Sequence, residues 1–185
     1  MSMDSPQLMT LLDDLGIAHP TVDHPPLRTV EDSRRLRGNL AGGHVKNLFL
    51  KDKKGGYWLL AALEHTTVDL RVAAALLGAP RFSFAKAEDL AEILGIIPGA
   101  VSPLAVVNDP EGRVAVVLDQ RLLELSLLNF HPLRNDRTTT IASTDLLKFL
   151  EAVDHPPQMI HLPDRTDEST GTQRNANSVM SSLCG

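Results

Sequence analysis

The stretch NLFLKDKKGGYWLLAAL, residues 47–63, decides the fold that we predict for this chain. Two apolar runs of strand character, 47–51 and 57–63, flank the glycine-containing sequence DKKGG. This pattern is a strong local signal for a β-hairpin, because glycine supplies the positive φ angles that tight turns need. We therefore expect two antiparallel strands here, with Lys46 and Asn47 at the beginning of the first.

Helix and strand patterns continue on both sides of this hairpin. Leucines at helical spacing, with Pro6 near the start and Gly16 as the stop, predict an amphipathic helix over 4–16. Capping residues and terminal glycines predict further helices over 29–38, 66–78, 86–95 and 143–153. Short strands are predicted at 21–22, 81–85, 104–108, 113–119, 124–130 and 138–142, with the turn sequence DPEG joining the pair at 104–108 and 113–119 into a second hairpin.

These elements predict an α+β fold. Strands slightly outnumber helices and hairpins dominate, so we expect a mixed, mainly antiparallel β-sheet flanked by helices. With 185 residues and 43% hydrophobic content, the chain is long enough for one well-buried domain. We assign this single domain to residues 1–163. Residues 164–185 hold few large apolar side chains and no sustained period, so we expect a polar, disordered C-terminal tail.

Composition limits the class of protein. The only cysteine, Cys184, excludes a disulfide framework and a CxxC zinc ligand pair. No apolar stretch approaches the roughly 20 residues that span a bilayer, and MSMDSPQLMT lacks the features of a secretory signal. We expect a soluble, cytoplasmic protein without a membrane partner.

Charge is distributed unevenly along the chain. The formal net charge of -5 argues against a protein that coats nucleic acid indiscriminately, because such binding depends on phosphate neutralisation. Residues 28–54, however, hold eight basic and three acidic residues, a net charge of +5. A local basic face on an acidic body suits a defined polyanionic partner, although a solvated hairpin and helix face explains the same charges.

Several common sites are absent from the sequence. It contains no GxSxG, GxGxxG or GxxxxGK[ST] motif, and none of the seven histidines has another at i+3 or i+4. We therefore expect no metal and no cofactor. The residues left as candidates for chemistry are Lys46, Asn47, the glycine-proline loop 95–103 and His131.

Four ordered blocks carry a resemblance to a known family: GGHVKNLFLKDKKG (42–55), VDLRVAAALLGAPRFSFA (68–85), LGIIPGAVSPLAVVND (94–109) and LLNFHPLRNDRTTTIASTDLLKFL (127–150). In this order they resemble the YbaK-like superfamily of trans-editing deacylases, which are related to the prolyl-tRNA synthetase insertion domain. The branch of Ala-tRNA(Pro) deacylases is the most similar. The resemblance covers roughly residues 5–155, and the tail has no part in it.

The resemblance implies an enzyme that hydrolyses the ester between a wrong amino acid and the terminal adenosine of tRNA. It implies that Lys46, Asn47 and His131 form the active site. It also implies that Gly95, Pro98 and Gly99 belong to a substrate loop of the form GxxPGxVxP. Basic residues near Lys51 and Arg81 face the acceptor stem in this family. It also implies a metal-free reaction that recruits the 2'-hydroxyl of the substrate, and the acceptor end of mischarged tRNA(Pro) as partner.

These residue types suit ester hydrolysis. Negative charge develops on the carbonyl oxygen, and preorganised donors lower the barrier. We expect Lys46 to meet the terminal phosphate or the oxyanion, Asn47 to supply a neutral amide, and His131 to hold the ribose or aid proton transfer. Exposed N–H groups of the loop are expected to cradle the aminoacyl carbonyl.

Selectivity is expected from an apolar pocket that acts as a second sieve, because a proline pocket cannot strongly reject a smaller amino acid. Candidates for its walls are Leu27, Val30, Leu36 and the loop at Gly95.

Alternatives stay open at this point. The same fold could act on Cys-tRNA(Pro) or another small mischarged amino acid, or the chain could be a non-catalytic nucleic-acid-binding module. Each candidate residue also has a structural explanation: a helix stop and turn for the loop, a structural role for the histidine, and a solvated strand edge for Lys46 and Asn47. Prolyl-tRNA synthetase and elongation factor are possible partners that the sequence does not distinguish.

Overall fold

The computed structural model of the chain describes residues 2–26 and 40–163. The predicted helix at 29–38, the proposed pocket walls Leu27, Val30 and Leu36, and the tail at 164–185 lie outside the described residues. Within them, no helix has both the length and the apolar character that crossing a membrane requires.

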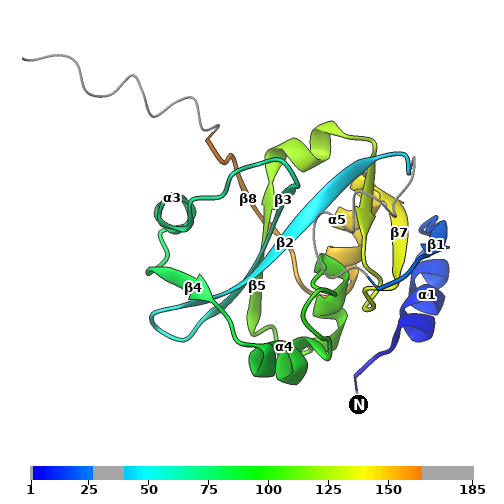
Figure 1. Cartoon of the computed structure of the whole chain (residues 1–185), viewed down its shortest axis with the longest axis horizontal. Helices are drawn as coiled ribbons and strands as arrows, with labels where there is room; N and C mark the ends of the chain where they lie inside the picture. Colours follow the sequence, from blue (N-terminus) through cyan, green and yellow to red (C-terminus); the bar gives the residue numbers. More distant parts are fainter. Residues whose placement is uncertain (1, 27–39, 164–185) are drawn as a thin grey trace, which may run out of the picture.

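Eight strands form one sheet in the described part of the chain, with the order β1-β7-β6-β2-β3-β5-β8 and with β4 paired to β2 (Figure 1). Four of the strand pairings are antiparallel and three are parallel. The predicted α+β fold with a mixed sheet is therefore confirmed. The strands are β1 Thr21–Asp23, β2 Gly43–Asp52, β3 Tyr57–Leu63, β4 Phe82–Phe84, β5 Val114–Asp119, β6 Leu127–Phe130, β7 Arg137–Ala142 and β8 Gln158–Ile160.

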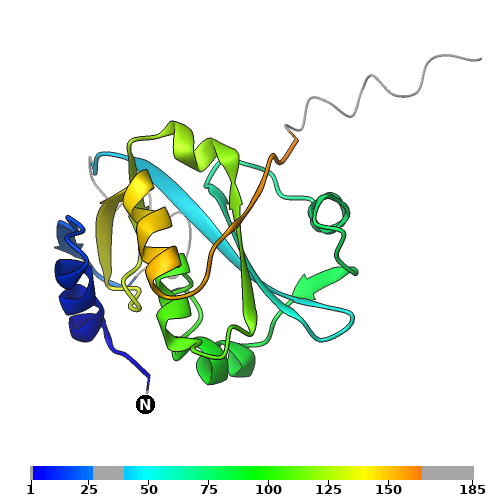
Figure 2. The same ribbon diagram turned by 180° about the vertical axis from the view of Figure 1, so that it is seen from behind.

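Helices cover the sheet on both faces. On one face, α1, α4 and α5 pack on a core that includes Phe49 and Leu59, and on the other, α3 packs on a smaller core with Leu50 and Leu60 (Figure 2). Apolar side chains at successive positions of β2 and β3 are thus buried on alternate faces. The helices are α1 Ser5–Asp14, α3 Leu70–Leu76, α4 Ala87–Leu94 and α5 Ser143–Ala152, with the 3-10 helices η1 Pro103–Asn108 and η2 Gln120–Glu124.

The predicted hairpin of residues 47–63 is confirmed as β2 and β3. Lys51 pairs with Tyr57 at its closed end. The Asp52 side chain fixes the turn, because its Oδ1 accepts from the N–H groups of Lys54 and Gly56 at 2.8 and 3.0 Å. Gly55 has a φ of 93°, as the turn sequence requires. The strand begins earlier than predicted, at Gly43, so Lys46 and Asn47 lie inside it rather than at its start.

The second predicted hairpin was wrong. Residues 104–108 belong to the buried 3-10 helix η1, so β5 has no antiparallel partner there and pairs in parallel with β3 and β8. An apolar run without alternation does not distinguish a strand from a buried helical segment. The residues at the start of the run favour the helix. Ser102 Oγ accepts from the N–H of Leu104 at 3.2 Å, and Pro103 occupies the first turn.

The N-terminal segment supports the loop that follows α4. Asn108 joins them, because its Oδ1 accepts from the N–H of Met3 at 2.6 Å while its Nδ2 donates to the carbonyls of Met3 and Leu94, each at 3.1 Å. Gly95 ends α4 with a φ of 63°. A Cβ added at Gly95 would lie 2.8 Å from the Cβ of Ser2, so this position has no room for a side chain.

Comparing two glycines measures how much the close approach of Ser2 to Gly95 affects stability. Gly95 and Gly112 have nearly the same φ, 63° and 65°, but a Cβ at Gly112 would meet nothing within 4 Å. Substitution by alanine costs about 1 kcal/mol for the left-handed conformation at either site. We expect Gly95→Ala to lose roughly 1–2 kcal/mol more than Gly112→Ala, because Ser2 must move. Urea unfolding of the two variants measures this difference, and equal losses would show that the N-terminal segment does not support the loop.

Candidate functional site

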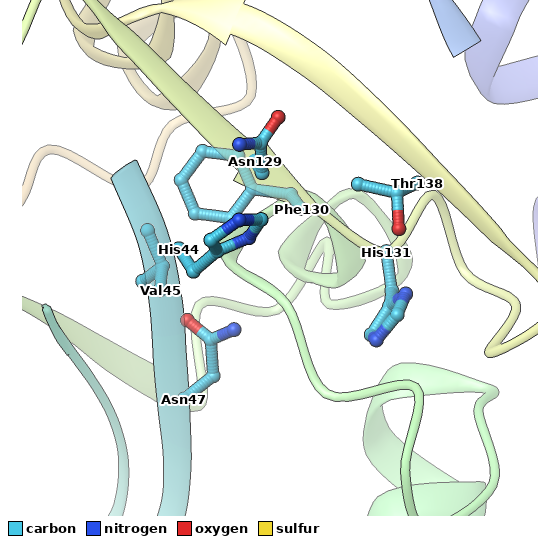
Figure 3. A pocket seen from close by; sticks show the side chains of 7 residues that line it. All are labelled: His44, Val45, Asn47, Asn129, Phe130, His131 and Thr138. Carbon is cyan, nitrogen blue, oxygen red and sulfur yellow. The ribbon is translucent and has the colours of Figure 1, made fainter. Parts of the chain in front are cut away.

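A pocket lies where the first half of β2 meets the end of β6 and the start of β7. The parallel pairing of Gly43 and His44 with Leu128 and Asn129 brings these strands together. Figure 3 shows His44 and Asn47 on the β2 side, with Thr138 and His131 across from them. The residues that line the pocket are His44, Val45, Asn47, Asn129, Phe130, His131 and Thr138.

Asn47 presents a buried hydrogen-bond acceptor at this pocket. Its Nδ2 donates to the carbonyl of Val101 at 3.0 Å. Because a carbonyl only accepts, this contact fixes which end of the amide is the donor and leaves Oδ1 as the acceptor. Asn47 Oδ1 is buried and has no hydrogen-bond partner in the described structure. A buried polar atom without a partner costs free energy, so Asn47 Oδ1 is a candidate acceptor for a donor from outside the chain.

His131 lies at the end of β6, on the far side of the pocket from Asn47. Its Nδ1 is 2.9 Å from the carbonyl of Arg137 and must donate to it. In the neutral ring the lone pair is therefore on Nε2, and Nε2 is the atom that can accept a proton. The structure thus brings two of the predicted site residues, Asn47 and His131, into one pocket.

Lys46 is not among the residues that line this pocket. Successive side chains of a strand point to opposite faces, so Lys46 shares a face with Leu48 and Leu50, whereas Asn47 shares one with Phe49. Lys46 Nζ donates to the carbonyl of Thr66. Burial lowers the pKa of Lys46, and the carboxylate of Glu64 only partly opposes this effect. The protein therefore holds this ammonium group in surroundings that disfavour its charge.

The glycine-proline loop 95–103 contacts the pocket residue Asn47 through Val101, which was not among the three loop residues predicted for the substrate. Ala100 N donates to the carbonyl of Ile97 at 3.1 Å, which closes a turn with Pro98 and Gly99 at its corners; Gly99 has a φ of 92°, as a type II turn needs. Gly95, Pro98 and Gly99 are not among the pocket-lining residues. The contact comes from the carbonyl of Val101, which accepts from Asn47.

The two residues predicted to bind tRNA, Lys51 and Arg81, lie near each other at the hairpin. The pairing of β2 with β4 places Ser83 opposite Lys51, and the carbonyl of the exposed Arg81 accepts from the N–H of Lys53 at 3.1 Å. Lys51 Nζ contacts Tyr57 Oη at 2.7 Å and Asp89 Oδ1 at 3.5 Å. The hydrogen bond to Tyr57 and the nearby Asp89 raise the pKa of Lys51. At about 3.3 Å per residue, Lys51 is about 13 Å along β2 from Asn47.

Asn129 and Thr138 line the pocket but were missed in the sequence. Both ends of the Asn129 amide form hydrogen bonds within the protein. Nδ2 donates to the carbonyl of Ala41 at 3.0 Å, and Oδ1 accepts from Thr140 Oγ1 at 2.6 Å. The available signal was the polar character of Asn129 and of the threonine run 138–140 in strands that are otherwise buried. His44, whose role the sequence left open, also lines the pocket.

A second hollow lies between the turn at 109–112 and the end of α5. Within it, His155 Nε2 is 3.2 Å from Asp109 Oδ2, and both side chains are buried. The same carboxylate oxygen accepts from the N–H of Val114 at 2.8 Å, so this pair joins η1, β5 and the chain after α5. Among the described residues, no group of three or more His, Cys, Asp or Glu side chains is arranged to hold a metal ion.

Comparisons with known proteins agree on one family. Residues 24–149 match the model of the aminoacyl-tRNA editing domain. The chain is 34% identical over 154 residues to the prolyl-tRNA editing protein ProX of Acetoanaerobium sticklandii, covering 82% of this chain and 94% of that protein. It is 36% identical over 160 residues to the prolyl-tRNA synthetase associated domain-containing protein 1 of Xenopus laevis, covering 84% and 95%.

A solved structure described as a candidate trans-editing enzyme for prolyl-tRNA synthetase has the same fold. Its TM-score is 0.67 at 22% sequence identity, covering 89% of this chain and 99% of that one.

The two asparagines of the pocket predict different effects on stability. Asn129→Ala removes two hydrogen bonds and leaves the buried Thr140 hydroxyl without its partner, so we expect the free energy of unfolding to fall by about 2–3 kcal/mol. Asn47→Ala removes one hydrogen bond together with an acceptor that has no partner, so we expect a loss below about 1 kcal/mol. Urea unfolding of both variants tests this, and equal losses would contradict the assignment of Asn47 to a ligand rather than to the fold.

Proposed function

The chain belongs to the aminoacyl-tRNA editing domain family, and on that premise we propose that it clears Ala-tRNA(Pro) in trans. It is an aminoacyl-tRNA deacylase: water attacks the carbonyl carbon of the aminoacyl ester, the bond to the ribose 3'-oxygen breaks, and free amino acid and tRNA are released. The observation that carries the proposal is the buried, unpartnered Oδ1 of Asn47 in the same pocket as His131.

The pocket supports roles for Asn47 and His131 at the aminoacyl-adenosine. Asn47 Oδ1 can only accept, so it suits an N–H or O–H group of the substrate and not a developing oxyanion. His131, held by the carbonyl of Arg137, offers Nε2 to the 2'-hydroxyl or to the attacking water. The proton taken up there can return to the leaving 3'-oxygen, which completes the hydrolysis.

Lys46 is the proposed contact for the terminal phosphate. The sequence left the phosphate and the oxyanion open as its target, and the position of Lys46 on the other face of β2 from Asn47 favours the phosphate. Burial lowers the pKa of Lys46, which means that the charged side chain is destabilised there. A bound phosphate would offset this free energy by pairing with the ammonium group.

Alanine is the proposed amino acid. The names of the relatives refer to prolyl-tRNA, and the four sequence blocks resemble the Ala-tRNA(Pro) deacylase branch. A smaller amino acid escapes rejection by a proline pocket, since one methylene is worth about 1–3 kcal/mol, and a second sieve that admits only small side chains removes it. Cys-tRNA(Pro) is the alternative substrate.

We place the acceptor end of tRNA(Pro) along β2. With the terminal adenosine near Asn47, the exposed Arg81 and the lysines of the hairpin lie towards the acceptor stem. Lys51 has intramolecular partners, so we expect a smaller contribution from it than from Arg81. Prolyl-tRNA synthetase, which produces the mischarged tRNA, is a proposed partner, and the cytoplasm is the expected location.

Deacylation of three charged tRNAs tests the proposed substrate. We expect Ala-tRNA(Pro) to be hydrolysed at least about tenfold faster than Cys-tRNA(Pro), and Pro-tRNA(Pro) to be spared, because the sieve works by side-chain size. Release of labelled amino acid measures each rate. Faster hydrolysis of Cys-tRNA(Pro) would identify the alternative substrate, and equal hydrolysis of all three, or none, would contradict the proposal.

Lys46 is expected to matter for activity and not for stability. Lys46→Ala should lower kcat/KM by about 10- to 100-fold, because a charged hydrogen bond to the terminal phosphate, worth about 1.5–3 kcal/mol, is removed. Its free energy of unfolding should stay within about 1 kcal/mol of the wild type, because burial already disfavours the charge. Lys148→Ala, an exposed lysine on α5, is the control and should change kcat/KM by less than about threefold. Near-normal turnover by folded Lys46→Ala protein would remove this lysine from the mechanism.

A further inference from the structure

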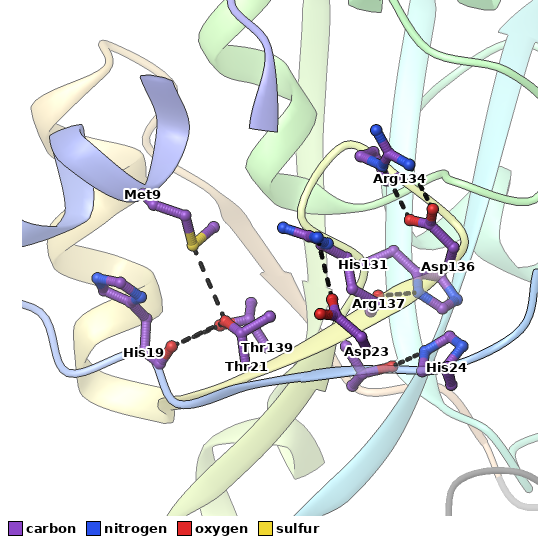
Figure 4. Close-up of polar contacts among 11 residues, drawn as sticks. Met9, His19, Thr21, Asp23, His24, His131, Arg134, Asp136, Arg137 and Thr139 are labelled. Carbon is purple, nitrogen blue, oxygen red and sulfur yellow. Dashed lines mark hydrogen bonds and ion pairs between the residues drawn. The ribbon is translucent and has the colours of Figure 1, made fainter. Parts of the chain in front are cut away.

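His24 lies directly behind the pocket, at the end of β1. The pairing of β1 with β7 sets Val22 opposite Thr138 and Asp23 opposite Arg137, and the N–H of His24 donates to the carbonyl of Asp136 at 2.9 Å. An ion pair of 3.0 Å between Asp23 and Arg137 holds the same two strands together. Figure 4 shows His24 beside His131, the pocket residue at the end of β6. No motif in the sequence identified His24.

The two hydrogen bonds of the His24 ring determine that the hydroxyl of Thr138 donates to His24. Its Nδ1 is 2.9 Å from the carbonyl of Pro25, which can only accept, so Nδ1 carries the hydrogen. Its Nε2 is 2.9 Å from Thr138 Oγ1, and in the neutral ring this nitrogen can only accept. The hydroxyl proton of Thr138 is therefore directed to His24, and the oxygen of Thr138 keeps its lone pairs for the pocket.

The pocket consequently presents a second acceptor besides Asn47. Thr138 is 4% exposed, so its hydroxyl cannot exchange freely between partners in water. The rings of His24 and His131 meet edge to face, with centroids 6.1 Å apart and an interplanar angle of 62°. This contact joins the residue that orients Thr138 to the one that we propose for proton transfer.

We propose that His24 is a positioning residue of the deacylase site, which acts by holding Thr138 as a hydrogen-bond acceptor for an N–H or O–H group of the aminoacyl-adenosine. The proposal rests on the proposed function. The substrate has two donors of this kind near the ester, the α-ammonium group of the amino acid and the 2'-hydroxyl of the ribose. A residue that only fastened β1 to β7 would serve the fold equally well with the Thr138 hydrogen bond in either direction.

The tautomer of His24 can be measured in the free protein, whatever the function. Two-dimensional NMR of protein with 15N-labelled histidine, recorded at pH 8, distinguishes a ring protonated on Nδ1 from one protonated on Nε2. The proposal predicts the Nδ1–H form for His24, assigned by the loss of its signals in His24→Gln. An Nε2–H ring would overturn the proposal, since Thr138 would then receive a proton rather than give one.

Binding of a stable substrate analogue tests the role of His24. The probe is an acceptor-stem minihelix whose 3'-terminal adenosine carries alanine through an amide, which the enzyme cannot hydrolyse as an ester. We expect His24→Leu to raise its Kd by about five- to tenfold, the effect of one lost hydrogen bond. His24→Gln should stay within about threefold of wild type, because its Oε1 can accept the same hydroxyl proton. His19→Leu, a histidine paired with Asp13 outside the pocket, is the control and should leave Kd unchanged.

A double-mutant cycle and two modified probes complete the experiment. Because His24 acts through Thr138, the pair His24→Leu and Thr138→Val should bind no more weakly than Thr138→Val alone. A probe that carries propanoyl in place of alanyl and so lacks the α-ammonium group, or one with a 2'-deoxyribose, should abolish the effect of His24→Leu, and the probe that does so identifies the donor. Additive effects of the two substitutions, or a His24→Leu protein within about twofold of wild type, would contradict the proposal. If wild-type protein fails to bind any probe, the proposed function is wrong, whereas tight binding that is indifferent to His24 overturns this inference alone.

Discussion

The backbone pairing of β2 is the interaction on which the rest of the structure depends. This strand is hydrogen-bonded to β3 along most of its length, to β6 at its start and to β4 at its end. Its apolar residues are buried in a core on each face of the sheet. Because one strand runs from the pocket to the basic hairpin, a rigid backbone sets the spacing between the residues proposed for the ester and those proposed for the acceptor stem.

The alternation of side chains along β2 separates two functions that are neighbours in sequence. Asn47 lies on the face of Phe49, where it meets Val101 and the pocket, and Lys46 lies on the face of Leu48 and Leu50. Adjacent residues of β2, about 3.3 Å apart along the strand, thus hold an amide acceptor and an ammonium group in different surroundings. Ester and phosphate are adjacent but distinct parts of the same nucleotide, so this separation suits a substrate that contacts both faces of β2.

Local signals explain which parts of the fold could be predicted from the sequence. The hairpin at 47–63 depends on neighbours in the chain and on a glycine turn, and it was predicted correctly. The segment 104–108 was not, because an unbroken apolar run carries no period and its capping by Ser102 went unnoticed. The predicted site was partly brought together: Asn47 and His131 share a pocket, but alternation removes Lys46 from its lining, and Val101 rather than Gly95 or Gly99 reaches Asn47. The contact between His24 and Thr138 spans 114 residues and depends on the register of β1 on β7, which no local pattern encodes.

The structure of the complex with the amide-linked alanyl minihelix would test the central claim most directly. The account predicts that the alanyl-adenosine lies between Asn47 and His131, with a donor of the substrate within hydrogen-bonding distance of Asn47 Oδ1 while Nδ2 remains on the carbonyl of Val101. The terminal phosphate should lie within reach of Lys46 Nζ. An alanyl-adenosine bound elsewhere, for example in the hollow beside Asp109 and His155, with Asn47 Oδ1 still unpartnered, would contradict it.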